Sequence, residues 1–209
     1  MFGTKRSLWR TIRVAVTVLL LASQSEAASN RPPAPQGGDY STSRYRGEVY
    51  LLRGFADVFS GGLDQLGADL ARAGIPAKVV NHSAWKSVGE KIAANQKKFG
   101  RKPVILIGHS LGANSAISMA QQLKKTGVTV TLLVTLAATA PPPVPSNVRK
   151  VENHYFKSGG WGEMVRASPD FRGSLKNLDH SGKAEVGHFN LDDQAAIQKI
   201  LLRAVRANF

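Results

Sequence analysis

Segments typical of strands and of helices alternate regularly from residue 46 to the end of the 209-residue chain. Runs rich in Val, Ile and Leu are separated by segments whose apolar residues recur every three or four positions, the helical period. The run 103–107 is apolar on both faces, as in a strand at the centre of a parallel sheet. Alternating strands and helices form βαβ units. We therefore predict a three-layer α/β/α fold with a mostly parallel, six-stranded sheet.

The individual elements can be assigned by residue number. The strand candidates are 48–52, 77–80, 103–107, 128–136, 149–157 and 174–178. The helical stripes are 63–70, 88–99, 113–123 and 197–204, and a glycine follows each of the first three. In open parallel sheets, the chemistry lies at the carboxyl ends of the strands. Functional residues are expected at this edge.

The N-terminus has the layout of a secretory signal peptide. Four basic residues precede an apolar stretch, 14–22, and a small and polar segment follows it. A membrane-spanning helix needs about 20 apolar residues, more than this stretch offers. We predict a signal peptide at 1–28, a disordered linker at 29–45 and one domain at 46–209. The chain would then be secreted or periplasmic; an uncleaved N-terminal membrane anchor is the alternative.

Composition excludes several classes of function. The chain has no cysteine, which removes disulfide scaffolds, cysteine-ligated zinc, iron–sulfur clusters and a cysteine nucleophile. Neither a P-loop nor a dinucleotide-binding fingerprint occurs, and no cluster of residues has metal-ligand spacing. We therefore expect no cofactor and no metal.

The charge of the chain is strongly basic, with 28 Lys and Arg against 14 Asp and Glu, a net charge of +14. Removal of 1–28 would leave 24 basic and 13 acidic residues, a net charge of +11. The basic residues are scattered and form no recognised nucleic-acid-binding motif. We expect no nucleic-acid partner, and a basic surface that favours weak association with an anionic membrane or cell envelope.

One turn carries the main catalytic candidate. The strand 103–107 runs directly into Gly108-His109-Ser110-Leu111-Gly112, and a helical stripe follows at once. A nucleophile elbow needs this order of strand, tight turn and helix, and the glycines give the turn room. The alternative is a glycine-rich connection whose serine only caps the helix. The context favours Ser110 as a nucleophile.

Residues 105–113 resemble the nucleophile segment of the α/β-hydrolase superfamily, particularly its small lidless bacterial lipases, esterases and thioesterase-like serine hydrolases. The similarity extends over most of 47–206. It implies that an acid and then a histidine follow Ser110 along the chain. His188 lies between the last strand candidate and the final helix, so the resemblance assigns it the role of general base. The alternative is that His188 is a histidine of a surface loop without a catalytic role. His109 is assigned no catalytic role.

The acid is the part of the pattern that departs from the superfamily. No carboxylate follows the strand 128–136, where many members have one. Asp179 closes the strand candidate 174–178 and is our choice to orient His188, with Glu163 and Asp170 as alternatives. A Ser–His pair oriented by a backbone group or a water molecule also remains open.

Two backbone N–H groups would form the oxyanion hole. One is that of Leu111, at the start of the helix. By resemblance, the second comes from the loop after the first strand, and Phe55 is the expected donor. Arg53 precedes this loop, either as a structural ion-pair partner or as a contact for a substrate carboxylate.

These expectations combine into one function, that of an exported serine hydrolase acting on small-molecule or lipid carboxylic esters through an acyl-enzyme. The same machinery would serve a thioesterase or an amide or peptide hydrolase. A non-catalytic binding protein with a degenerate triad is the alternative from another class.

Overall fold

The computed structural model describes residues 45–55, 60–159 and 161–209. The predicted signal peptide, 1–28, and the predicted linker up to residue 44 lie outside this part of the chain. Tyr45, the last residue of the predicted linker, is buried, and its hydroxyl donates to the Glu48 carboxylate at 3.0 Å. The packed domain therefore includes Tyr45.

Six parallel strands form a single sheet in the order β2-β1-β3-β4-β5-β6. Their bounds are β1 Glu48–Arg53, β2 Ala77–Asn81, β3 Val104–His109, β4 Val130–Leu136, β5 Val148–Tyr155 and β6 Ser174–Asp179. This confirms the predicted α/β fold. Every residue of β3 is buried, as its two apolar faces predicted, because helices cover both sides of it.

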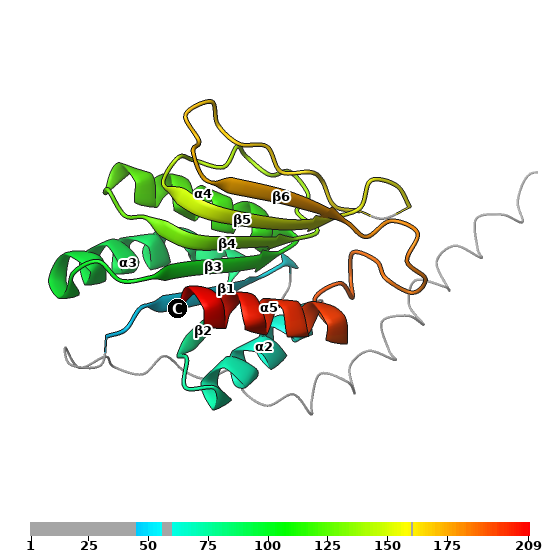
Figure 1. The fold of residues 1–209 in the computed structure, drawn as a ribbon, viewed down its shortest axis with the longest axis horizontal. Coiled ribbons are helices and arrows are strands. Elements are labelled where there is room, and N and C mark those ends of the chain that lie inside the picture. The colour runs from blue at the N-terminus through cyan, green and yellow to red at the C-terminus, as the bar shows by residue number, and fades with distance from the viewer. Residues whose placement is uncertain (1–44, 56–59, 160) are drawn as a thin grey trace, which may run out of the picture. The chain divides into compact units, whose positions relative to one another are not determined.

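The helices form two layers, one on each face of the sheet (Figure 1). Helices α2 (Gly61–Arg72) and α5 (Ala195–Asn208) pack with one face into a core that includes Leu66, Ile105 and Leu201. Helices α3 (Trp85–Phe99) and α4 (Leu111–Lys125) pack with the other face around Ile92, Leu106 and Ile117. The two cores hold the sheet rigid between them, which fixes the ends of its strands.

The ends of β3 and α4 leave room for a single residue between them. Strand β3 continues two residues beyond the predicted 103–107, through His109, and α4 begins at Leu111. Ser110 therefore stands alone at the carboxyl edge of the sheet, with β1 and β4 on either side of its strand.

Within the described residues, no helix combines the length and apolar character that a membrane crossing requires.

Candidate active site

Ser110 occupies a strained turn between β3 and α4. Its backbone dihedrals are φ 56° and ψ −122°, in a region that residues other than glycine rarely adopt. A Cβ at position 108 would lie 2.2 Å from the Gly112 carbonyl oxygen, and one at position 112 would lie 2.0 Å from the Leu52 carbonyl oxygen. Only glycine fits at either position. The predicted glycine pattern thus has a steric cause, and the turn has the form of a nucleophile elbow.

His188 meets Ser110 across the sheet edge. It lies in the loop between β6 and α5, and its Nε2 is 2.9 Å from Ser110 Oγ. Both residues are largely buried, with 8% of Ser110 and 5% of His188 exposed. The structure therefore brings together the predicted nucleophile and the predicted base at hydrogen-bond distance.

The other ring nitrogen of His188 faces a main-chain carbonyl. Its Nδ1 lies 2.6 Å from the carbonyl oxygen of Trp161. A carbonyl oxygen can only accept a hydrogen bond, so Nδ1 must carry the proton. Nε2 of the neutral ring is then free of a proton and accepts from the Ser110 hydroxyl. The carbonyl selects the tautomer that a general base needs.

The segment that carries the Trp161 carbonyl is fastened to the carboxyl ends of two strands. The Phe156 N–H donates to Gly162 O at 3.3 Å, and the Glu163 N–H donates to Ala138 O at 2.7 Å. A Cβ on Gly162 would lie 2.8 Å from the Cα of Ala137, so the segment approaches the end of β4 more closely than a larger residue allows. These contacts fix the position of the carbonyl.

The structure does not bring Asp179 to His188, which corrects our choice of the orienting acid. The Asp179 carboxylate accepts hydrogen bonds from the N–H groups of Lys157 (3.1 Å) and Ser181 (2.9 Å). The hydrogen bonds from Ser181, and that from Lys157, lower the pKa of Asp179. Asp179 closes a turn after β6, because a carboxylate at a strand end can satisfy nearby loop amides instead of an imidazole.

Among the described residues, neither of the two alternative acids forms a hydrogen bond with the His188 ring. Asp170 accepts from Lys124 Nζ at 2.6 Å and from the hydroxyls of Ser146 and Ser168. These bonds hold its pKa well below the usual range. The Glu163 residue is exposed. Of the possibilities that the sequence left open, orientation of the His188 ring by a backbone group is therefore the one that fits the geometry.

The two predicted oxyanion donors border the same cavity as Ser110. Leu111 is the first residue of α4, where N–H groups lack partners within the helix. The peptide before Phe55 is held by a hydrogen bond between Gly54 O and His82 Nδ1 at 3.2 Å. In a trans peptide, the C=O and the following N–H point in opposite directions, so this bond fixes the direction of the Phe55 N–H.

Of the two roles predicted for Arg53, the structure shows that of a structural ion-pair partner. Its guanidinium forms an ion pair with the carboxylate of Asp64 on α2, and both side chains are mostly buried. The pair links the end of β1 to the helix beside it.

His109, which the sequence assigned no chemistry, supports the loop that carries His188. Its Nε2 lies 2.7 Å from the main-chain carbonyl oxygen of His188, to which it donates. Its Nδ1 then accepts from Ser60 Oγ at 3.0 Å, and the same Ser60 oxygen accepts from the Gly54 N–H at 2.9 Å. One buried chain of hydrogen bonds thus joins the base loop to the loop of the predicted oxyanion hole.

A buried carboxylate lies behind His109. Asp192 Oδ1 is 3.8 Å from His109 Nδ1, and both side chains are almost inaccessible. Burial lowers the pKa of His109 to about 4, and burial, with the nearby charge of Asp193, raises the pKa of Asp192 to about 7. His109 is therefore neutral near neutral pH, and the contact is not a full ion pair.

Two further histidines pair with each other rather than with Ser110. His154 Nδ1 lies 2.9 Å from His180 Nε2, at the carboxyl ends of β5 and β6. Of the five histidines in the chain, His188 is the one whose ring is bonded to the Ser110 hydroxyl.

A cavity of about 230 Å³ opens over Ser110. Its walls are mainly apolar and include three large side chains that are more than half exposed, Phe55, Trp161 and Phe189. The Trp161 ring stacks on the His188 ring with centroids 4.5 Å apart, and Phe189 meets the same ring edge-on at 4.9 Å. The cavity suits an apolar group attached to the atom that Ser110 attacks.

In the part of the chain that the structure describes, no group of three or more His, Asp or Glu residues is arranged to hold a metal ion.

The family model described as a thioesterase domain matches residues 63–155. A comparison with curated proteins finds no match.

Solved structures that are similar to the chain include the following two. A candidate hydrolase of the alpha/beta superfamily from Xanthomonas campestris pv. campestris is 16% identical, covers 78% of this chain and 99% of its own, and has a TM-score of 0.47. The NocB thioesterase domain, solved as a covalent complex with a fluorophosphonate nocardicin G analog, is 15% identical, covers 78% and 94%, and has a TM-score of 0.48.

Proposed function

From its α/β-hydrolase fold and thioesterase-like sequence, we propose that this chain is a serine hydrolase that cleaves carboxylic esters and thioesters. The observation that carries the proposal is the contact of Ser110 Oγ with His188 Nε2 at 2.9 Å, at the mouth of an apolar cavity. A serine hydroxyl becomes an effective nucleophile when a base takes its proton.

The reaction follows from the positions of these groups. Ser110 Oγ attacks the acyl carbon while His188 Nε2 takes the hydroxyl proton. The Leu111 and Phe55 N–H groups stabilise the oxyanion, and the imidazolium gives the proton to the leaving alcohol or thiol as its bond to the acyl carbon breaks. Water then attacks the acyl-enzyme, with His188 again accepting and returning a proton. The acid is released and Ser110 is regenerated.

Thioesters are favoured over amides by the group that orients His188. The Trp161 carbonyl offers a partial charge, whereas a carboxylate would offer a full one, so the imidazolium is stabilised less. A thiol has a pKa of about 8.5, so a thiolate leaves with little help from an acid, while an amine must be protonated. The similarity to thioesterase domains points to the same class.

The aromatic walls indicate the acyl side of the substrate. Phe55, Trp161 and Phe189 offer apolar surface near Ser110, and a cavity of about 230 Å³ holds a short or medium acyl chain more readily than a long one. A longer chain would have to extend over the exposed parts of these side chains.

Matched substrates test the proposal. Acetyl, butyryl, octanoyl and palmitoyl groups would each be offered as an oxygen ester, a thioester and an amide of comparable alcohol, thiol and amine. We expect kcat/KM to be greatest for short or medium thioesters and esters, with negligible amide hydrolysis. Ser110→Ala, which retains the fold but not the nucleophile, should be inactive. Binding of these compounds without turnover would instead identify a non-catalytic binding protein.

We also propose that the chain acts outside the cytoplasm, since residues 1–28 have the pattern of a signal peptide. The weak association with anionic envelope surfaces belongs to this proposal and depends on the excess of basic residues. N-terminal sequencing of the protein recovered from the periplasm or medium tests cleavage after residue 28. An intact N-terminus in a membrane fraction would support the anchor alternative.

A further inference from the structure

A second cavity, of about 680 Å³, lies at the amino edge of the sheet, opposite the edge that carries Ser110. Pro103 directly precedes β3, Thr129 directly precedes β4, and Arg149 is the second residue of β5. A strand rises ~3.3 Å per residue, which places this cavity about 20 Å from Ser110. It is therefore separate from the candidate active site.

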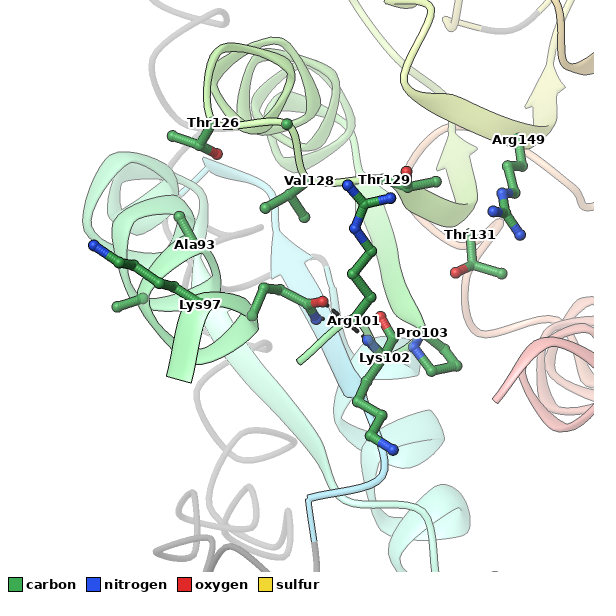
Figure 2. A pocket seen from close by; sticks show the side chains of 13 residues that line it. Ala93, Lys97, Arg101, Lys102, Pro103, Thr126, Val128, Thr129, Thr131 and Arg149 are labelled. Carbon is green, nitrogen blue, oxygen red and sulfur yellow. Dashed lines mark hydrogen bonds between the residues drawn. The ribbon is translucent and has the colours of Figure 1, made fainter. Parts of the chain in front are cut away.

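The walls of this cavity are strongly basic. Four cationic side chains line it, and none of the described residues that line it is acidic; the cations are Lys97, Arg101, Lys102 and Arg149. In Figure 2, the Arg101 side chain extends towards Thr129 and the Arg149 side chain extends alongside Thr131, while Lys97 and Lys102 extend away from the two arginines. Both arginines and both threonines thus line the same cavity.

Only some of the basic residues of the domain are paired with a carboxylate. Arg53, Arg72, Lys124 and Lys150 each form an ion pair with an acidic side chain. Among the described residues, neither Arg101 nor Arg149 has an acidic side chain within 4.0 Å. A helix dipole explains a cation in the last turn of a helix, such as Lys97, but it does not explain Arg149 on a strand.

The cavity also has a fixed frame. The Gln96 side chain holds the main chain of Lys102 by two hydrogen bonds, at 2.9 and 3.1 Å, which anchors the loop that carries Arg101. The Thr131 hydroxyl oxygen accepts from the Val104 N–H at 3.3 Å, so its own proton is available to a ligand. These bonds fix the main chain beside Arg101 and the hydroxyl oxygen of Thr131, while the side chains of Arg101 and Arg149 are exposed to solvent.

We propose that this cavity, which we call the basic pocket, binds a phosphate group between Arg101 and Arg149. Guanidinium groups bind phosphate oxygens through paired hydrogen bonds, and a doubly charged anion offsets the repulsion between the two arginines. Ala93, Val128 and Pro103 add apolar surface for the organic part of the ligand. The ligand class is a phosphate ester, either soluble or in a phospholipid headgroup.

The binding test uses the full chain and two matched double variants. Arg101→Gln with Arg149→Gln removes both guanidinium groups, and Arg203→Gln with Arg206→Gln removes the same charge from exposed positions on α5. Inorganic phosphate and glycerol 3-phosphate are titrated by calorimetry at low ionic strength. We expect saturable binding that weakens at least tenfold in the pocket variant and changes less than twofold in the α5 variant. An absence of saturable binding, or equal weakening in both variants, would overturn the proposal.

Sedimentation with vesicles identifies the source of the phosphate. Phosphatidylcholine vesicles with and without phosphatidic acid are compared for the wild type and the pocket variant. Binding to phosphatidic acid that the pocket variant loses assigns a lipid headgroup, and binding of glycerol 3-phosphate alone assigns a soluble ester; both support the pocket. The wild type and the pocket variant have the same basic N-terminal segment, so any binding of that segment to the vesicles is equal in both proteins and cancels in the comparison.

Ester hydrolysis and the thermal unfolding midpoint, which should stay unchanged, report that the double variants are folded. If the pocket variant does not fold, Arg149→Lys keeps the charge and loses the paired geometry, and severalfold weaker phosphate binding is expected. Binding unaffected by this change would overturn the role of Arg149. Loss of phosphate binding with hydrolysis intact separates this site from the proposed activity.

Discussion

The Nδ1 atom of His188 lies 2.6 Å from the main-chain carbonyl oxygen of Trp161, so a peptide group stands where a carboxylate stands in a Ser-His-Asp triad. The carbonyl fixes the tautomer and direction of the ring as a carboxylate would. It lacks the full charge that would stabilise the imidazolium. This difference underlies the predictions for activity.

Asp179→Asn should leave activity unchanged within about twofold, because the Asp179 carboxylate binds the N–H groups of Lys157 and Ser181 and not His188. In a triad, loss of the orienting carboxylate lowers kcat by about 10⁴-fold. Steady-state kinetics on one short-chain ester measures the effect. Asp170→Asn serves as a matched control, and a loss above tenfold confined to Asp179→Asn would restore the triad.

Gly162→Ala should lower kcat by about 10²-fold, since a misplacement of about 1 Å at a reacting group has that effect. The new Cβ would lie 2.8 Å from the Ala137 Cα, and relief of the clash must move the adjoining Trp161 carbonyl. Ser158→Ala tests the same loop without a clash or a change of backbone conformation, because it only shortens an exposed side chain. Equal activity in the two variants would show that the carbonyl position does not matter.

The pH dependence of kcat/KM follows from the His188 environment. Burial lowers the pKa of His188 below its usual 6.5, against the opposing effect of the bond to the Trp161 carbonyl. The neutral ring is the base, so activity should rise with pH through a midpoint below 6.5 and be level at neutral pH. A pH profile on a non-ionising ester gives the midpoint. A midpoint above 6.5 would indicate a negative charge beside the ring, contrary to the structure.

Asp192→Asn should stabilise the fold at pH 8. Burial raises the Asp192 pKa from 3.8 to about 7, so its stabilising protonated form is fully present below pH 4 and is lost as the pH rises through 7. The gain at pH 8 should be on the order of 2–4 kcal/mol, and it should shrink towards pH 4. Urea unfolding at several pH values measures it.

The exposed Glu90→Gln is the control for that substitution. His109 lies 3.8 Å from Asp192, and its low pKa destabilises the fold as the pH falls below 6.5, so the comparison is repeated in a His109→Gln background. In that background, the difference between Asp and Asn at position 192 isolates the carboxyl group. A gain that is the same at pH 5 and pH 8 would contradict the titration of a buried carboxyl.

Patterns of residue type predicted the sheet and the nucleophile. The fully buried strand β3 and the glycines at 108 and 112 leave direct traces in the sequence, because burial selects apolar residues and close backbone approach selects glycine. His188 was chosen among five histidines because the resemblance to the α/β-hydrolase superfamily implies a base between the last strand and the final helix.

No comparable pattern in the sequence indicated which group orients His188. Every residue has a carbonyl, so nothing about Trp161 as a residue type marks its oxygen as the partner of His188. The missing carboxylate after β4 was the available clue, and it led to Asp179 by strand position alone. The contact of His109 with the His188 carbonyl joins residues 79 positions apart, and such a pairing depends on the packed fold.

Reaction with a fluorophosphonate probe tests the central claim, that His188 activates Ser110. The full chain is labelled and the adduct is mapped by mass spectrometry. The account predicts one adduct, on Ser110, absent in Ser110→Ala and formed at least 100-fold more slowly in folded His188→Ala, with His180→Ala labelled like the wild type. No adduct on Ser110 of the folded chain, or equal labelling in His188→Ala, would contradict it.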